Sequence, residues 1–460
     1  MSNTTANGGR RSSHVVLFAY PKQGHLSPML QFAKRLASKG LRITFLTTTS
    51  ATKSLEIDLP ASYQIDLRFI SDVRTEPILS LKDEHESFEA VVSKSFGDFI
   101  DGTLRSSGYD PPRFVVFDSV MPWAMDVARV RGIGSAPFFT ESCVVNHILN
   151  QVYKGSFSIP PVENVAAGIS IPPLPVLQTE DLPYFSYEPE LVLKFMTDQF
   201  SSFKNAKWIF VNTFDQLEMK VVNWMTQKWP IKTIGPSIPS AYLDGRLKDD
   251  KTYGLNHQNL NNCKIFQWLN SKEIASVIYI SFGSLVILPD KQVNELASFL
   301  KNTNLSFLWV LRESEQEKLP NNFVQQTSHK GLVVKWCCQL QVLSHKAVSC
   351  FVTHCGWNST IEALSLGVPM VAVPQWIDQT TNAKFIADVW KVGARVKMND
   401  KGIATKLELE ASLRHVSQGY RQNEIKQNSI KLRNLAKEAM DEGGSSDKNI
   451  EQFVKELDPF

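Results

Sequence analysis

Hydrophobic runs of strand length alternate with amphipathic segments of helix length in the first half of the chain. The run HVVLFAY, His14–Tyr20, is apolar throughout and is followed by a turn, PKQGH. Residues 27–40 space their apolar side chains three and four positions apart and stop at a glycine, which is typical of an amphipathic helix. Residues 41–49 form the next strand-like run. Strand, helix and strand in this order predict a βαβ unit and a parallel sheet.

The same alternation returns twice more along the chain. Residues 113–118, RFVVFD, predict a buried strand, and an amphipathic segment follows them. Residues 238–262 are polar and irregular, and a second alternating series begins after them with SVIYISFGS. We therefore expect two α/β halves joined by a linker. Ligands of such sheets bind beyond the carboxyl ends of the strands, so a cleft between the halves is the expected site.

Composition narrows the class of protein. The 460 residues carry a formal net charge of +3, too small to favour nucleic acid or an anionic membrane as partner. No apolar stretch approaches the ~18 residues of a membrane span. The polar, glycine-rich residues 1–13 are expected to be a disordered tail rather than a secretory signal. The six cysteines include no CxxC pair, which favours reduced thiols and a cytoplasmic protein.

The stretch VTHCGWNST, residues 352–360, contains many polar side chains directly after a predicted strand. A metal site is one interpretation, but only Cys350 and His354 would share a strand face, and no further ligand pair lies nearby. A nucleophilic Cys355 is another, but its side chain would diverge from that of His354, and a third orienting group is missing.

A nucleotide diphosphate site accounts for more of the stretch. A helix is expected to start near residues 358–360, and its free N–H groups and dipole would bind phosphate, with Gly356 allowing close approach. Ser359 and Thr360 could equally be plain helix caps. Glu362 lies one turn beyond Asn358, a position suited to ribose hydroxyls. The sequence holds neither GxxxxGK[ST] nor a D-x-D metal-diphosphate motif, so we expect a metal-independent reaction.

The segment from Trp336 to Gln379 resembles the signature box of plant UDP-dependent glycosyltransferases, with Trp, Gln, HCGWNS, Glu, GVP and a terminal DQ in register. The resemblance extends to YPKQGHLSPML, FDSVMPWA and SFGS, and so over nearly the whole chain. It is closest to the subgroup that glucosylates small carboxylic acids, phenolics and terpenoid or steroid alcohols. It implies a GT-B fold: two Rossmann-like domains face each other, and the last helix crosses back to the first. It also implies inversion at the anomeric carbon without a metal.

The resemblance assigns domains and donor contacts. It implies an acceptor-binding domain over residues 14–237, a UDP-sugar-binding domain over 263–440 and a returning helix over 441–460. The residues implied to hold UDP-glucose, a co-substrate rather than a cofactor, fall into four groups. They are Trp336 with Cys337 and Gln339 at the uracil; Ser284, His354, Asn358 and Ser359 at the diphosphate; Glu362 at the ribose; and Trp357, Asp378 and Gln379 at the sugar. Cys338 departs from the family, many members of which carry proline there.

Two residues of the first half are expected to carry the chemistry. His25 lies in the turn after the first strand, and Asp118 ends another strand of the same sheet. A carboxylate that holds an imidazole fixes its tautomer and stabilises its protonated form. A lone histidine in a turn could be merely a solvated side chain, but the resemblance assigns His25 the role of base and Asp118 that of its partner.

The acceptor is expected to be a small hydrophobic molecule bound by loops of the first half, and the chain is expected to act as a monomer. The expected pocket segments are residues 76–94, the strand end PFFTES at residues 137–142, and residues 181–190. The expected aromatic wall consists of Trp123, Phe138, Phe139, Tyr184 and Phe185. Each could instead be an ordinary core residue. Whether a hydroxyl or a carboxyl group is attacked stays open. The alternatives are a GT-B-like UDP-sugar epimerase and a catalytically silent UDP-sugar-binding protein.

Overall fold

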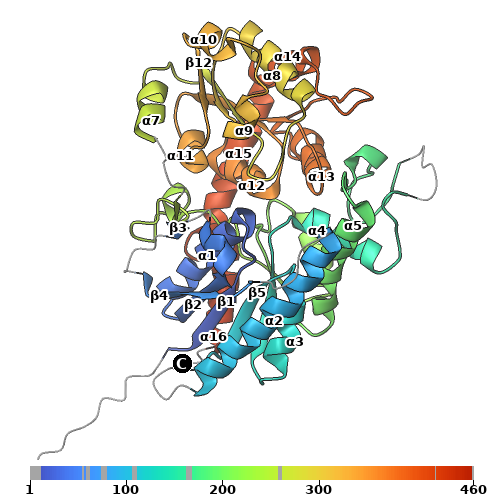
Figure 1. Ribbon diagram of the computed structural model, residues 1–460, viewed down its shortest axis with the longest axis vertical. Coiled ribbons are helices and arrows are strands. Elements are labelled where there is room, and N and C mark those ends of the chain that lie inside the picture. The colour runs from blue at the N-terminus through green and yellow to red at the C-terminus, as the bar shows by residue number, and fades with distance from the viewer. Residues whose placement is uncertain are drawn as a thin grey trace, which may run out of the picture.

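Two parallel sheets, one in each half of the chain, organise the computed structural model (Figure 1). The structure describes residues 12–53, 56–57, 63–73, 80–105, 111–161, 168–256, 262–419 and 421–457. The expected tail therefore lies almost entirely outside the described residues. So do residues 76–79 of one expected acceptor loop, residues 257–261 of the expected linker and residues 458–460 of the returning helix.

The first sheet has seven strands in the order β4-β2-β1-β5-β6-β7-β8. Every residue of β1 and β5 is buried, because helices cover both faces of a parallel sheet. The strands are β1 His14–Phe18, β2 Arg42–Thr48, β4 Ile65–Ile70, β5 Phe114–Asp118, β6 Gly134–Phe139, β7 Ile209–Val211 and β8 Ile231–Thr233. The helices of this half are α1 Gln23–Ser38, α2 Leu81–Arg105, α3 Trp123–Arg129, α4 Cys143–Tyr153, α5 Pro189–Asp198 and α6 Met219–Thr226.

The second sheet has six strands in the order β12-β11-β10-β13-β14-β15. They are β10 Val277–Ser281, β11 Ser306–Val310, β12 Gly331–Val334, β13 Val348–Thr353, β14 Met370–Ala372 and β15 Gly393–Arg395. The helices are α7 Asn262–Asn270, α8 Asp290–Asn302, α9 Glu313–Gln316, α10 Phe323–Thr327, α11 Gln339–Leu343, α12 Trp357–Leu366, α13 Gln379–Lys384, α14 Lys406–Ser417, α15 Gln422–Met440 and α16 Ser445–Leu457. Two parallel-sheet domains of this kind confirm the expected GT-B architecture.

Some boundaries differ from the sequence-based expectation. The helix α1 begins at Gln23, so the expected turn PKQGH is partly the first turn of that helix. Helix α13 ends at Lys384, and the chain continues with π geometry over Phe385–Val389. A short antiparallel pair, β3 Glu56–Ile57 with β9 Leu255–Asn256, joins the segment between the halves to the first half. These differences depend on contacts between distant parts of the chain, which local patterns do not reveal.

The last helix, α16, returns to the first sheet, as Figure 1 shows. Ser446 donates a 2.6 Å hydrogen bond to the carbonyl of Gly235, and Asn449 donates one of 2.9 Å to the carbonyl of Thr233. Phe453 is fully buried and packs edge-on against Phe114 and Phe210. The chain end therefore forms part of the core of the first half.

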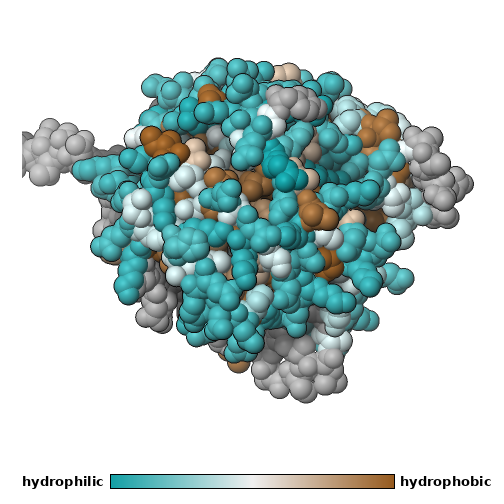
Figure 2. All heavy atoms as spheres, turned by 90° about the horizontal axis from the view of Figure 1, so that it is seen from above, coloured by the Kyte–Doolittle hydropathy of each residue, from teal (hydrophilic) through white to brown (hydrophobic). Residues whose placement is uncertain are grey.

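The surface of the second half, seen from above, is mostly hydrophilic, with hydrophobic residues scattered across it (Figure 2). In the described part of the chain, no helix combines the length and the hydropathy needed to cross a membrane.

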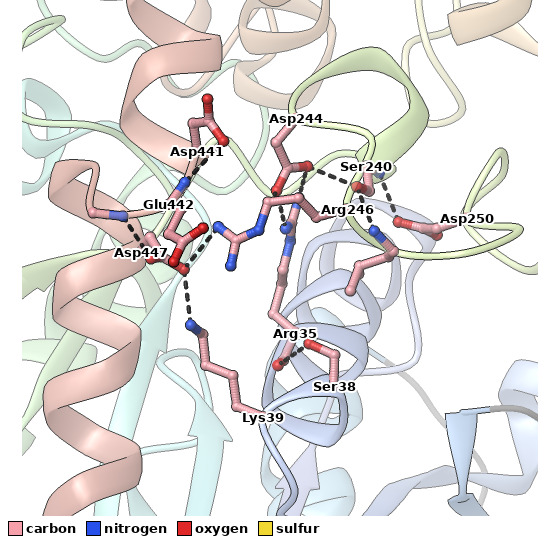
Figure 3. Close-up of polar contacts among 12 residues, drawn as sticks. Arg35, Ser38, Lys39, Ser240, Asp244, Arg246, Asp250, Asp441, Glu442 and Asp447 are labelled. Atoms are coloured by element: carbon pink, nitrogen blue, oxygen red, sulfur yellow. Dashed lines mark hydrogen bonds and ion pairs between the residues drawn. The ribbon is translucent and has the colours of Figure 1, made fainter.

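Ion pairs join α1, the segment after β8 and α16 (Figure 3). The two terminal guanidinium nitrogens of Arg35, Nη1 and Nη2, donate to the carboxylate of Asp244 at 2.6 and 2.7 Å. Asp447 of α16 accepts from Lys39 at 2.8 Å and pairs with Arg246 at 3.3 Å. Burial alone would raise the pKa of Asp244, but the hydrogen bonds and charge of Arg35 outweigh it and lower that pKa.

Replacing Asp244 with asparagine should destabilise the protein, because Arg35 would stay buried without its carboxylate. Breaking one partner of a buried pair costs about 3–5 kcal/mol of unfolding free energy. A pKa that is lowered in the folded state stabilises the protein above the unfolded value of about 3.9 and ceases to do so as pH falls. Urea denaturation at pH 7 and at about pH 2, below the unfolded value, would measure both effects. Glu86→Gln, which removes an exposed pair with Lys82, is the control and should change little. An Asp244→Asn variant as stable as the wild type at pH 7 would contradict the prediction.

Candidate active site

The two sheets bring their topological switch points to one cleft. In the first sheet the chain order reverses between β1 and β5, and in the second between β10 and β13. Ligands of open parallel sheets bind at such points, beyond the carboxyl ends of the strands. His25 follows β1 and Asp118 ends β5, whereas Ser284 follows β10 and His354 follows β13. All of these except the buried Asp118 line one cleft of about 630 Å³, to which both halves contribute.

His25 and Asp118 form a hydrogen-bonded pair. The imidazole Nδ1 lies 2.8 Å from the Asp118 carboxylate, which is fully buried, while the histidine side chain is 22% exposed toward the cleft. Burial by itself would lower the pKa of His25, but the charge of Asp118 and its hydrogen bond outweigh burial and raise that pKa. With Nδ1 held by the carboxylate, Nε2 is the nitrogen left to take a proton from a molecule in the cleft.

The opposite wall begins at the N-terminus of α12. His354 is buried between Gly283 and Gly356, where an added Cβ would meet the imidazole at 2.8 and 2.6 Å, so both positions require glycine. Burial lowers the pKa of His354 to about 4, so its imidazole is neutral near pH 7. Among the described residues its Nδ1 has no hydrogen-bond partner. A neutral imidazole beside a helix N-terminus is suited to donating a hydrogen bond to an anion.

Glu362 is the centre of a polar network on α12. Its two carboxylate oxygens accept from the Tyr253 hydroxyl at 2.7 Å and from the Gln339 amide at 2.8 Å. The same amide donates to the Ser359 hydroxyl at 3.0 Å. Burial raises the pKa of Glu362 to about 7, partly offset by these hydrogen bonds. Gln339, Ser359 and Glu362, which the resemblance assigns to the uracil, the diphosphate and the ribose, are thus joined by hydrogen bonds.

A hydrogen bond joins the two walls directly. Pro28 lacks an N–H and so cannot donate to the carbonyl four residues earlier in α1, that of Gly24. That carbonyl instead accepts a 2.6 Å hydrogen bond from the side-chain amide of Asn358. This hydrogen bond fixes how closely the start of α1 lies to the start of α12. It thereby also fixes the position of His25 opposite His354.

Trp357, Asp378 and Gln379, the three residues expected at the sugar, also lie in the lining of the cleft. The backbone N–H of Trp357 donates to Asp378 at 3.1 Å, and its indole N–H donates to the carbonyl of Asn212 in the first half at 2.7 Å. Burial raises the pKa of Asp378 to about 6. The amide oxygen of Gln379 accepts from the backbone of Gln375 at 2.9 Å. Each of the expected trio lines the cleft, with its orientation fixed by hydrogen bonds.

The residues expected at the uracil lie at the other end of the same wall. Trp336 and Cys337 follow β12 and line the cleft, and the Cys337 sulfur lies 3.4 Å from the Tyr279 hydroxyl. In the described part of the chain, no group of three or more His, Cys, Asp or Glu side chains is placed to hold a metal ion.

The expected aromatic wall is wrong. Phe138 and Phe139 belong to β6 and are fully buried in the core, because helices cover both faces of the sheet. Trp123, Tyr184 and Phe185 do not line the cleft either. The apolar lining of the first half comes instead from Tyr20, Phe88, Leu191, Val192, Phe195 and Met196. Of the expected segments, two contribute to the lining: the residues around Phe88, which are helical, and Thr140 and Glu141 of the strand end PFFTES.

Three further residues of the site could not be singled out individually from the sequence: Glu141 and Tyr253, which line the cleft, and Asn212, whose carbonyl holds Trp357. Glu141 lies in the segment PFFTES, where a carboxylate between an apolar strand and a serine cap was a usable signal. Tyr253 and Asn212 lie far in sequence from their partners, and no local pattern marks them.

Comparison with known proteins agrees with this architecture. The family model described as UDP-glucoronosyl and UDP-glucosyl transferase matches residues 190–440. Mogroside I-E synthase from Siraitia grosvenorii is 65% identical, over 99% of this chain and 100% of its own. UDP-glycosyltransferase 74E2 from Arabidopsis thaliana is 45% identical, over 97% and 99%. The crystal structure of Os79 from O. sativa in complex with UDP has a TM-score of 0.87 at 35% identity, covering 96% of this chain and 100% of Os79. These relatives support a glycosyltransferase and not an epimerase, and the chain belongs to the family of UDP-dependent glycosyltransferases.

Proposed function

We propose that the chain transfers glucose from UDP-glucose to a hydroxyl or carboxyl group of a small hydrophobic plant metabolite, with inversion at the anomeric carbon. One observation carries the proposal: the His25–Asp118 pair and the anion-binding start of α12 face each other across a single cleft of about 630 Å³. A base on one wall and a nucleotide site on the other are what a direct displacement between two substrates needs.

The donor would lie along the second half. In this proposal Trp336, with Cys337 and Gln339 beside it, takes the uracil and Glu362 takes the ribose, in exchange for its hydrogen bond from Tyr253. Ser284, His354, Asn358, Ser359 and the first N–H groups of α12 take the diphosphate. Trp357, Asp378 and Gln379 take the sugar hydroxyls.

The transfer itself would be one displacement. The acceptor oxygen attacks the anomeric carbon as the bond from that carbon to the diphosphate oxygen breaks, and the acceptor proton passes to Nε2 of His25. UDP leaves with the electron pair, and its developing charge is met by His354 and the α12 N–H groups. Asp118 stabilises the imidazolium that forms.

The acceptor would lie against the apolar wall of the first half. The relative with 65% identity is named as a mogroside I-E synthase, and the apolar lining of the first half supports a hydrophobic acceptor for this chain. A panel of phenols, carboxylic acids and terpenoid or steroid alcohols, each assayed with UDP-glucose, tests the proposal. Formation of glucosides supports it, and failure with every member of the panel would count against it.

UDP-glucose should be preferred over UDP-galactose and UDP-glucuronate. Each sugar hydroxyl left unpaired in a site built by Trp357, Asp378 and Gln379 costs ~1–3 kcal/mol, so kcat/KM should differ by about tenfold or more. Initial rates with the three donors at a fixed acceptor concentration would measure this. Equal kcat/KM for UDP-galactose would refute the donor assignment.

The rate should not depend on a divalent metal ion, because N–H groups and neutral His354 are proposed to meet the charge of the leaving diphosphate. Activity measured after excess EDTA and desalting should equal that of the untreated enzyme. A loss that Mg²⁺ or Mn²⁺ restores would show that a metal ion takes part.

We also propose that the chain acts as a monomer in the cytoplasm, where its six cysteine thiols would stay reduced.

A further inference from the structure

Glu141 is a buried carboxyl group on the acceptor side of the cleft. It follows β6, which lies beside β5, so its position at the carboxyl end of the sheet adjoins that of Asp118. The residue is 8% exposed and lines the same cleft as His25. Its backbone carbonyl accepts from Asn146, but among the described residues its side-chain Oε2 has no hydrogen-bond partner.

Glu218, the next buried glutamate along the chain, makes the contacts expected of a structural role and serves as a comparison for Glu141. The two carboxylate oxygens of Glu218 accept from the backbone N–H groups of Cys143 and Val144, at 3.1 and 2.9 Å, at the N-terminus of α4. Ser142 caps the same helix through the N–H of Val145. The helix start is therefore satisfied without Glu141, whose carboxyl group has no part in capping it.

The charged groups around Glu141 belong to three other segments. They are His25 of α1, Asp118 at the end of β5 and Asp378 before α13. Burial raises the pKa of Glu141 to about 7, with His25 opposing the shift and Asp378 and Asp118 adding to it. The charge of Glu141 in turn raises the pKa of His25, although less than Asp118 does, whereas the charge of Lys22 lowers that pKa. A buried carboxylate oxygen without a protein partner among the described residues, such as Oε2 of Glu141 in the lining of the cleft, is placed to accept from a hydrogen-bond donor.

We propose that Glu141 determines acceptor specificity: its carboxyl group hydrogen-bonds a hydroxyl group of the acceptor and disfavours acceptors that present a carboxylate to His25. This inference rests on the proposed function and sharpens it from hydroxyl or carboxyl acceptors to hydroxyl acceptors. A carboxylate beside His25 would lie near Asp118 and, above about pH 7, near an ionised Glu141 in a poorly solvated site, where like charges repel strongly. A neutral hydroxyl meets no such repulsion and can donate to Glu141.

Glu141→Gln preserves the size of the side chain and removes its charge. The ratio of kcat/KM for a carboxylic acid to that for an alcohol on the same ring system should therefore rise about tenfold or more. The alcohol reaction should also change its pH profile. Removing a negative charge lowers the pKa of His25, and His25 must be neutral to accept a proton, so the acid limb of kcat/KM should move to lower pH. A role in packing alone would move neither quantity.

The experiment measures kcat/KM from pH 5 to 9 for the acid and the alcohol in the wild type, Glu141→Gln and the control Glu89→Gln, an exposed position on α2. Thermal melting checks folding, and calorimetry checks UDP affinity. An acid-to-alcohol ratio within twofold of the wild type, with an unmoved acid limb, would overturn the proposal. A wild type that binds UDP but glucosylates neither acceptor would instead refute the proposed function. A shift in Glu89→Gln equal to that in Glu141→Gln would also overturn the specific role of Glu141.

Discussion

Replacing His25 with alanine should lower kcat/KM for an alcohol acceptor by about 10²–10⁴, the usual contribution of a well-placed general base. An alcohol is a poor nucleophile near neutral pH, and Nε2 of His25, whose Nδ1 is held by Asp118, is the proposed base on the acceptor side of the cleft. UDP affinity should stay the same, because the proposed nucleotide contacts, such as those of Trp336 and Glu362, belong to the second half. Steady-state kinetics with an alcohol and calorimetry with UDP would measure the two quantities.

Two controls make the result specific. His329→Ala removes an exposed histidine far along the chain and should leave the rate unchanged. A carboxylate acceptor that is turned over at all should lose much less than the alcohol in His25→Ala, because it arrives without its proton. An alcohol rate within a few-fold of the wild type, with UDP affinity intact, would show that His25 is not the base.

Asp118→Asn should have an effect of similar size. The carboxylate fixes the imidazole tautomer through the 2.8 Å hydrogen bond to Nδ1 and stabilises the imidazolium that proton transfer creates. In hydrolases with the same His–Asp pairing, this change lowers kcat about 10⁴-fold. We expect a loss of about 10²–10⁴ in kcat for an alcohol here, with little change in UDP affinity.

The pH profile distinguishes this role from a loss of folding. The charge of Asp118 raises the pKa of His25, so Asp118→Asn should lower it and move the acid limb of the remaining activity to lower pH. Asp126→Asn is the matched control, since that carboxylate lies exposed on α3 and pairs only at the surface with Arg129. An Asp118→Asn variant with wild-type kcat for the alcohol would contradict the proposed pairing.

The strands and their order relative to the helices could be read from the sequence, because a strand buried on both faces is apolar along its length. The runs that contain β1 and β5 are of this kind, and the polar residue that ends β5, Asp118, marked the functional edge of the sheet. His25 could be chosen for the same reason, since a parallel sheet brings the ends of neighbouring strands together.

The start of α1 could not be read in the same way. The letters PKQGH are typical of a turn, yet Gln23 to His25 are helical. No side chain caps this helix start, and the hydrogen bonds from His25 to Asp118 and from Asn358 to Gly24 stabilise it from outside. Tertiary contacts here outweigh local preference.

The acceptor side was the least predictable part of the site. An aromatic residue in a loop and one in a buried strand end look alike in sequence, and Phe138 and Phe139 proved to be core. Contacts across the cleft, such as Tyr253 with Glu362, join residues more than a hundred positions apart. Such contacts depend on how the two halves pack, and neither hydrophobic periodicity nor motif spacing contains that information.

The central claim is that glucose passes directly from UDP-glucose to an acceptor in this cleft. Proton NMR of the enzyme with UDP-glucose and a terpenoid alcohol follows the anomeric signal of the sugar through the reaction. We expect the α-anomeric signal of the donor to be replaced by a β-glucoside signal, with one UDP released per glucoside. Conversion of UDP-glucose to another UDP-sugar without any acceptor, or a donor that stays bound and unchanged in the presence of every acceptor, would contradict it.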